Sequence, residues 1–400
     1  MKHEFQSGIV ILVSMFLTYA AWPQQTVIVA VPARAGAVEG ITENSDAFMW
    51  RILTNITSTV GNDTGSKVAF ETWATDNDTF TPNPHWPEVG EPMKLHKSVL
   101  ETMKAVGAAD AKMQMDLRAN TIDVDCGVPV GAAVGGFPTS GSPPPCIAEQ
   151  VERNRPLFDY IVTNKLYTQT GLETAYEKSM DIDMPLKSVA VKGDWVPLGA
   201  LLQWIPQLKT IDNIRKQYHT TVAQGVEYAL VSLHMASRQN KNWVWATFEH
   251  ELNPGRCDYI GCFDSFGAQK PAVGANKVAF NTQYGVCQKT LRLESLMKKA
   301  SLSPVWRHYC LKSSQVDFTA ADGTPYVLGN SVIEGIVGNG TVAASSCISC
   351  HYYASFGPTG ATTPRAKAIL PFNPTGNPIP GVLAGSRQFS FMWGILLAPK

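Results

Sequence analysis

The residues with the most specific chemistry lie near the C-terminus, in the run Cys347-Ile348-Ser349-Cys350-His351. Two thiols at this spacing can each form a thioether with one vinyl group at the edge of a haem. The adjacent histidine then lies under the iron as an axial ligand. The sequence therefore predicts one covalently attached haem c, tethered by Cys347 and Cys350 and ligated by His351.

The same C-x-x-C spacing also occurs in redox dithiols, zinc sites and plain disulfides. A thioredoxin-like dithiol needs a βαβ context, which the glycine-rich tail around the motif lacks. A zinc site needs a second pair of ligands nearby, and the sequence has none there. The haem interpretation is favoured because the chain also carries an export signal, described below, and bacteria attach haem c outside the cytoplasm.

The stretch from Tyr326 to Lys400 resembles a reduced c-type cytochrome domain, with a leading helix over 328–337, the C-x-x-C-H motif and an irregular tail. Cytochromes of the common small class use a methionine well downstream as the second axial ligand, so the resemblance implies Met392 as a second metal ligand beside His351. Only eight residues follow Met392, too few for the usual final helix. The resemblance supports haem attachment and leaves the sixth ligand open.

A looser similarity extends over the whole chain, to uncharacterised secreted bacterial haem proteins that carry a segment like Trp243–His250 (W-V-W-A-T-F-E-H). It implies no particular reaction.

The sixth ligand separates two kinds of function. A methionine or a second histidine closes the iron for electron transfer, whereas an open position admits oxygen, peroxide or a substrate. His234 and Met235 are adjacent on one predicted strand, so only one of them can face a given side. Alternation places His250 on the same strand face as Val244, Ala246 and Phe248. The candidates are Met392, Met235, His234, His250, His219 and His308.

The first hypothesis for function is a periplasmic monohaem redox protein that transfers single electrons to or from a redox partner protein. The alternative is a haem enzyme, an oxidase, peroxidase or oxygenase, with an open distal site. It is motivated by the 290 residues of 36–325, far more than an electron carrier needs. A third possibility is a docking protein whose haem serves a partner enzyme.

The N-terminus has the composition of an export signal. Lys2 precedes the apolar stretch 9–21, which is shorter than the ~20 residues that span a bilayer. We expect residues 1–35 to be a signal peptide, cleaved after Ala20 or after Ala35, and a periplasmic or secreted location. No later segment of the sequence is apolar for long enough to span a membrane.

The eight cysteines are an even number, which in an exported protein predicts disulfides. The six outside the motif allow 15 pairings. Pairing of neighbours gives three short loops, closed by Cys126–Cys146, Cys257–Cys262 and Cys287–Cys310.

The elements that must position the motif are a mixture of helices and strands. We predict helices over 50–60, 91–116, 148–163 and 290–299, and strands over 188–196, 226–235 and 243–250, the last two joined as a hairpin. The sequence thus predicts an α+β fold: a signal peptide (1–35), a large mixed domain (36–325) and a cytochrome c-like haem-binding segment (326–400).

The composition of the chain limits the classes of partner that we expect. Hydrophobic residues make up 44% of the chain, enough for a normal core, and charged residues only 16%. The net charge is zero, and no basic face is available to meet phosphates. We therefore expect no nucleic-acid partner.

Overall fold

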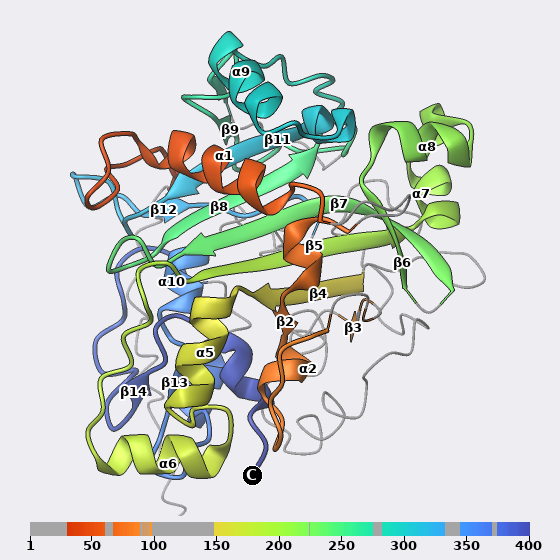
Figure 1. The fold of residues 1–400 in the computed structure, drawn as a ribbon. Helices are drawn as coiled ribbons and strands as arrows, with labels where there is room; N and C mark the ends of the chain where they lie inside the picture. Colours follow the sequence, from red (N-terminus) through yellow and green to blue (C-terminus); the bar gives the residue numbers. More distant parts are fainter. Residues whose placement is uncertain are drawn as a thin grey trace, which may run out of the picture.

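The computed structural model describes residues 30–60, 67–88, 91, 93, 96–97, 148–223, 225–274, 282–332, 345–369 and 374–400. In these ranges the chain forms a mixed α/β fold around one large antiparallel sheet (Figure 1). The predicted combination of helices and strands is confirmed. None of the described helices has the length and apolar character needed to cross a bilayer.

The main sheet has the strand order β11-β8-β7-β5-β4-β2, with β6 added beside β7 and β3 beside β4. Its strands are β2 (Ala74–Thr75), β3 (His96–Lys97), β4 (Ala148–Arg153), β5 (Val189–Pro197), β6 (Thr220–Ala223), β7 (Val226–Ser237), β8 (Val244–His250) and β11 (Tyr309–Gln315). Three small two-stranded sheets are β1 (Val31–Pro32) with β12 (Tyr326–Val327), β9 (Cys262–Phe263) with β10 (Ala272–Val273), and β13 (Ser355–Phe356) with β14 (Arg387–Gln388).

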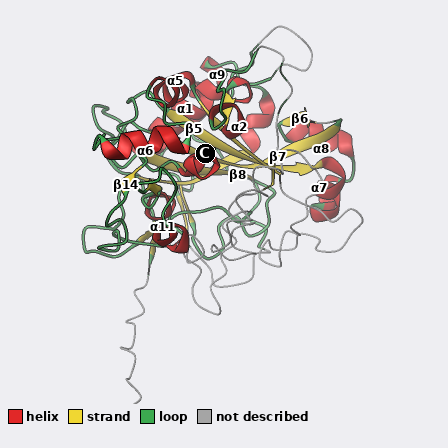
Figure 2. Cartoon of the chain, turned by 90° about the horizontal axis from the view of Figure 1, so that it is seen from below, coloured by secondary structure: helices red, strands yellow, loops and turns green. Residues whose placement is uncertain are grey.

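Helices cover both faces of the main sheet (Figure 1). On one face lie α1 (Ser45–Ile56) and α9 (Leu291–Lys299); on the other lie α5 (Arg155–Thr163), α6 (Gln169–Glu177) and α10 (Cys347–His351). The remaining helices are α2 (Asp76–Thr79), α7 (Leu198–Trp204), α8 (Ile211–Gln217), α11 (Pro364–Ile369) and the 3₁₀ helices η1 (Ala69–Thr72), η2 (Pro206–Leu208), η3 (Pro304–His308) and η5 (Trp393–Leu397). Viewed from below, in Figure 2, the C-terminus lies in front of the sheet.

Strand β8 shows why the sheet has two different faces. Val244, Ala246 and Phe248 belong to the core cluster under α1. Trp243 and Trp245 belong to the cluster that contains α10 and the C-terminal tail. Successive side chains of a strand point to opposite faces, so the alternation predicted for this segment is confirmed.

Several predicted elements are confirmed. β7 and β8 form the expected hairpin, with Ser237 paired to Val244. β5 matches the strand predicted over 188–196, and α9 matches the helix predicted over 290–299. The helix predicted over 50–60 exists but begins earlier, at Ser45, because the side chain of Asn44 caps it by accepting from the backbone N–H of Ala47 (3.1 Å).

The helix predicted over 148–163 is wrong in its first half. Residues Ala148–Arg153 form strand β4, and the helix begins only at Arg155. Pro156 occupies the first turn, where its missing N–H costs nothing, and Asn154 is the N-cap. β4 was missed because most of its buried side chains are polar, so it lacks the apolar alternation typical of a strand.

Two other predicted helices are contradicted in part. Within 91–116, His96–Lys97 form β3 against β4, and most of that segment lies outside the described residues. Within 328–337, residues 328–332 are not helical, and 333–337 lie outside the described residues. Leu328 instead bridges Ser346 in parallel, and its N–H donates to the carbonyl of Ser345 (2.8 Å).

Two of the three predicted disulfides are confirmed, Cys257–Cys262 and Cys287–Cys310. Cys126 and Cys146 lie outside the described residues. Disulfides fit an extracytoplasmic compartment, where thiols are oxidised.

The last residues of the predicted signal peptide (1–35) take part in the fold. Residues 1–29 lie outside the described residues, but β1 pairs in parallel with β12. Ala33 is buried, and its carbonyl accepts a hydrogen bond from Ser313 Oγ (2.6 Å). Cleavage after Ala20 would keep β1 in the mature chain.

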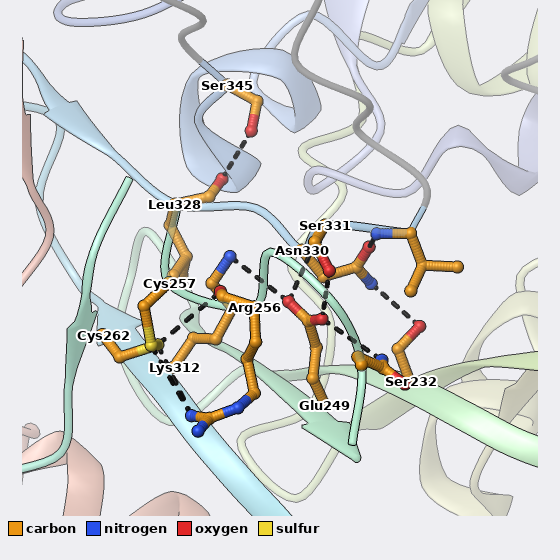
Figure 3. Close-up of polar contacts among 12 residues, drawn as sticks. Ser232, Glu249, Arg256, Cys257, Cys262, Lys312, Leu328, Asn330, Ser331 and Ser345 are labelled. Carbon is orange, nitrogen blue, oxygen red and sulfur yellow. Dashed lines mark hydrogen bonds and ion pairs between the residues drawn. A yellow bond between two sulfur atoms is a disulfide. The ribbon is translucent and has the colours of Figure 1, made fainter. Parts of the chain in front are cut away.

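A buried polar cluster attaches strands β8 and β11 of the main sheet to the segment before α10 (Figure 3). Glu249 on β8 and Lys312 on β11 are fully buried and form an ion pair of 3.2 Å. Glu249 also accepts hydrogen bonds from the N–H of Ser331 (2.8 Å) and from Asn253 Nδ2 (3.2 Å). The carboxylate therefore joins two strands to the 330–332 segment.

We predict that Glu249→Gln lowers the free energy of unfolding by about 3–5 kcal/mol, because Lys312 would keep a buried charge without its counter-ion. Urea denaturation measures the change. The double variant Glu249→Gln/Lys312→Met should recover part of the loss, since it removes both charges. A loss below about 1 kcal/mol in the single variant would contradict this role.

Candidate functional site

The C-x-x-C-H motif forms its own short helix, α10, rather than following one. Ser346 caps it, with its Oγ 3.4 Å from the N–H of Ser349. Gln315 at the end of β11 holds it from below by donating to Ser346 Oγ (2.9 Å) and accepting from the N–H of Ile348 (3.3 Å). Residues three and four positions apart share one side of a helix, so both thiols and the histidine face the same way.

The imidazole of His351 is oriented by a backbone carbonyl. Its Nδ1 lies 2.7 Å from the carbonyl oxygen of Phe391. A carbonyl oxygen only accepts, so Nδ1 carries the proton and Nε2 is left as the ligating nitrogen. This is the arrangement typical of metal-binding histidines. The ring also packs on Trp245, with 4.5 Å between ring centroids.

Cys347, Cys350 and His351 all line one hollow between α10, the sheet and the C-terminal tail. Its volume of about 1420 Å³ includes the space at its open mouth. The other lining residues include Asp76, Phe80, Glu149, Val151, Arg153, Ile161, Ala190, Lys192, His234, Ala236, Trp245, Met392, Trp393 and Leu397.

The donor set of the hollow fits a c-type haem. Two thiols stand beside one oriented imidazole, and side chains such as Phe80, Ile161 and Leu397 supply an apolar surface for a porphyrin.

One wall of the hollow carries paired charges. Arg153 on β4 forms a buried ion pair with Asp76 on α2, and its Nη1 donates to the carbonyl of Thr75 (2.6 Å). Lys192 on β5 lies 2.8 Å from Glu149 on β4. The two pairs cancel in charge, so this wall is polar without being strongly positive or negative.

Of the sixth-ligand candidates on the sheet, His234 faces the hollow. His234 on β7 pairs with Lys192 on the neighbouring strand β5, and its side chain lies on the sheet face opposite the core under α1. Its Nε2 lies 2.6 Å from Asn330 Nδ2 and 3.7 Å from Asp194 Oδ2. The side chain of Met235 packs in the core cluster under α1, and the residue also borders the hollow. The prediction that only one of the two can face a given side is confirmed.

Met392 lies in the wall of the same hollow, directly after the residue that holds His351. It is partly buried against the apolar cluster around α10. The side chain of the next residue, Trp393, donates from Nε1 to the carbonyl of Cys350 (3.2 Å). The tail therefore wraps around the C-terminal end of α10.

The other three histidine candidates do not line the hollow. His219 stacks on Trp306 and lies 3.1 Å from Glu71, and His308 lies 2.7 Å from Glu251. His250 is buried in a stack with Tyr218, 3.5 Å between ring centroids.

Sequence reasoning missed several residues of the site: the Phe391 carbonyl and the pairs Arg153–Asp76 and Lys192–Glu149. A backbone carbonyl leaves no signal in residue types. The charged pairs join positions far apart in the chain, so spacing could not reveal them either.

No family model, curated protein or solved structure matches this chain.

Burial lowers the pKa of His250 well below its usual 6.5. In the unfolded chain this imidazole takes up a proton near its ordinary pKa, so its contribution to stability is present above about pH 6.5 and is lost as the pH falls below it. We expect unfolding free energy to drop by about 1 kcal/mol through His250 between about pH 7 and pH 5.5.

Urea denaturation at the two pH values, compared between the wild type and His250→Gln, isolates this contribution from that of other groups. The variant should show the smaller drop. Equal drops would mean that His250 takes up its proton as readily in the folded protein as in the unfolded chain, which would contradict the lowered pKa.

Proposed function

We propose that this chain is a c-type haem protein that transfers single electrons outside the cytoplasm, with haem tethered by Cys347 and Cys350 and ligated by His351. The observation that carries the proposal is that all three side chains line one hollow of about 1420 Å³. The orientation of His351 by the Phe391 carbonyl supports it independently.

A haem bound there supplies an iron centre that gains and loses one electron. The two thiols would fix the group on α10, and the Phe391 carbonyl would orient the imidazole of His351 through Nδ1. The apolar lining limits water access, which is one way a protein sets a redox potential. A redox partner protein would exchange the electron at the open mouth.

The covalent attachment is directly testable in the protein expressed with a haem c maturation system. Cys347→Ala/Cys350→Ala should leave no haem on the denatured chain, because both thioethers are lost. Haem-stained denaturing gels and mass spectrometry of the chain measure this. The matched control is Cys257→Ala/Cys262→Ala, which removes two thiols from a disulfide away from the hollow and should keep the haem. Full staining of the first variant would refute the attachment.

One observation favours the alternative of a haem enzyme. His234, with Asp194 and Asn330 beside it, faces the hollow from the sheet, as a proton-transferring group in an open distal site would. Cyanide or carbon monoxide should change the absorption spectrum if the sixth position is open. A low-spin six-coordinate spectrum unchanged by either ligand supports the electron carrier and rejects the enzyme.

His234 and Met392 differ as sixth ligands. Met392 follows directly after the carbonyl that holds Nδ1 of His351, so its backbone starts behind the ring, away from Nε2. His234 faces the hollow from the sheet, which favours it over Met392 as a second residue that would hold the iron.

We therefore expect His234→Ala to convert a low-spin spectrum to high spin, and Met392→Leu to leave it low-spin. Absorption and electron paramagnetic resonance spectra of the purified variants distinguish the two. A high-spin Met392→Leu with an unchanged His234→Ala would assign the sixth ligand to Met392.

A further inference from the structure

Strand β4 has a second polar face, directed away from the hollow. Glu149, Val151 and Arg153 line the hollow, and the alternate residues Gln150 and Glu152 line a separate pocket of about 330 Å³. The pocket is closed by Glu71 of η1, Asp78 of α2 and Glu91.

Three oxygen atoms around this pocket have no hydrogen-bond partner in the part of the chain that the structure describes. They are Oε1 of Glu71, Oε1 of Gln150 and Oε2 of Glu152. Each of these side chains is at least nine-tenths buried. A buried polar oxygen without a partner destabilises the folded protein, so three together call for a ligand that satisfies them.

A second group of donors lies against the same pocket. Ligand atoms of Asp78, His85 and Glu91 all lie within 4.8 Å of one another. Asp78 and Glu91 approach His85 Nε2 to 3.6 and 3.8 Å. Such spacing suits a shared metal ion.

The charges around the pocket are unbalanced. Five carboxyl groups, those of Glu71, Asp78, Glu88, Glu91 and Glu152, line it together with the ammonium group of Lys67. Lys67 donates a hydrogen bond to the backbone carbonyl of Glu91. Burial, followed by the negative charges of Glu71 and Asp78, raises the pKa of Glu152 well above its usual value, although Lys67 opposes the shift.

We propose that this pocket binds a hard divalent cation, with calcium as the first candidate. The available donors are carboxylate oxygens, one amide oxygen and the exposed imidazole of His85, and this predominance of oxygen suits calcium, magnesium or manganese better than softer metals. Glu71, Gln150 and Glu152 supply the buried ligands, and Asp78 and Glu91 close the site.

The cation would also steady one wall of the hollow. Asp78 shares the short helix α2 with Asp76, and Glu152 precedes Arg153 on β4. Asp76 and Arg153 form the ion pair that faces the hollow. This inference goes beyond the proposed electron transfer and does not depend on it.

The test uses the full chain, treated with EDTA and then titrated with calcium. We expect the thermal midpoint to rise by about 5 °C at a calcium concentration 100-fold above Kd. Terbium, a calcium substitute, should show emission sensitised by Trp73, which lines the pocket. Calcium should displace it.

Glu152→Gln should abolish both responses, because it removes one carboxylate ligand. Its midpoint in EDTA should stay close to that of the wild type, since glutamine keeps the size of the side chain and an oxygen that can accept from Gln150 Nε2, and this separates lost binding from misfolding. Glu177→Gln on the exposed face of α6 is the matched control and should respond like the wild type.

An unchanged wild-type midpoint with calcium, magnesium and manganese would overturn the proposal, as would a response to zinc alone. Equal responses of the wild type and Glu152→Gln would overturn it as well. Because the variant lacking Cys347 and Cys350 should respond to calcium like the wild type, failure of the haem proposal would be distinguishable from failure of this one.

Discussion

The arrangement around α10 depends on the buried ion pair between Glu249 and Lys312. Two charges in the interior of a sheet are tolerated only when hydrogen bonds and an opposite charge compensate their lost hydration. Here the compensation comes from the 330–332 segment, which must lie against β8 to provide it. Leu328, at the start of that segment, bridges the beginning of α10. The position of the motif is therefore set by a polar contact, and apolar packing completes it.

The parts of the fold that could be predicted are those where local pattern and tertiary environment agree. Strand β8 alternates because each of its faces meets a different apolar cluster, and the hairpin with β7 follows from the polar turn between them. The Cys257–Cys262 and Cys287–Cys310 loops are short enough for neighbour pairing to succeed. The motif stands out in the sequence because the haem attachment that it predicts requires one fixed spacing, and that attachment stays a prediction.

Strand β4 could not be predicted, for a physical reason. Its side chains are buried on both faces, yet most of them are polar, so no apolar period exists to detect. The compensating groups come from far away in the chain: Asp76 for Arg153, and Lys192 for Glu149. Only the folded sheet brings these partners together. The same limit applies to His351, whose orienting group is a backbone carbonyl in the tail.

The two faces of β4 differ in how their charges are balanced, and this difference separates the functions that we propose for them. On the face toward the hollow, Arg153 and the neighbouring Lys192 each have a carboxylate partner. A redox group bound there would therefore change its charge beside a wall with no net charge. Facing the smaller pocket, carboxylates outnumber the cation, and three buried oxygens lack partners in the described part of the chain. Neighbouring residues of one strand are only about 3.4 Å apart. A ligand that fixes Glu152 must therefore restrict Arg153, so occupancy of the pocket would be felt in the hollow.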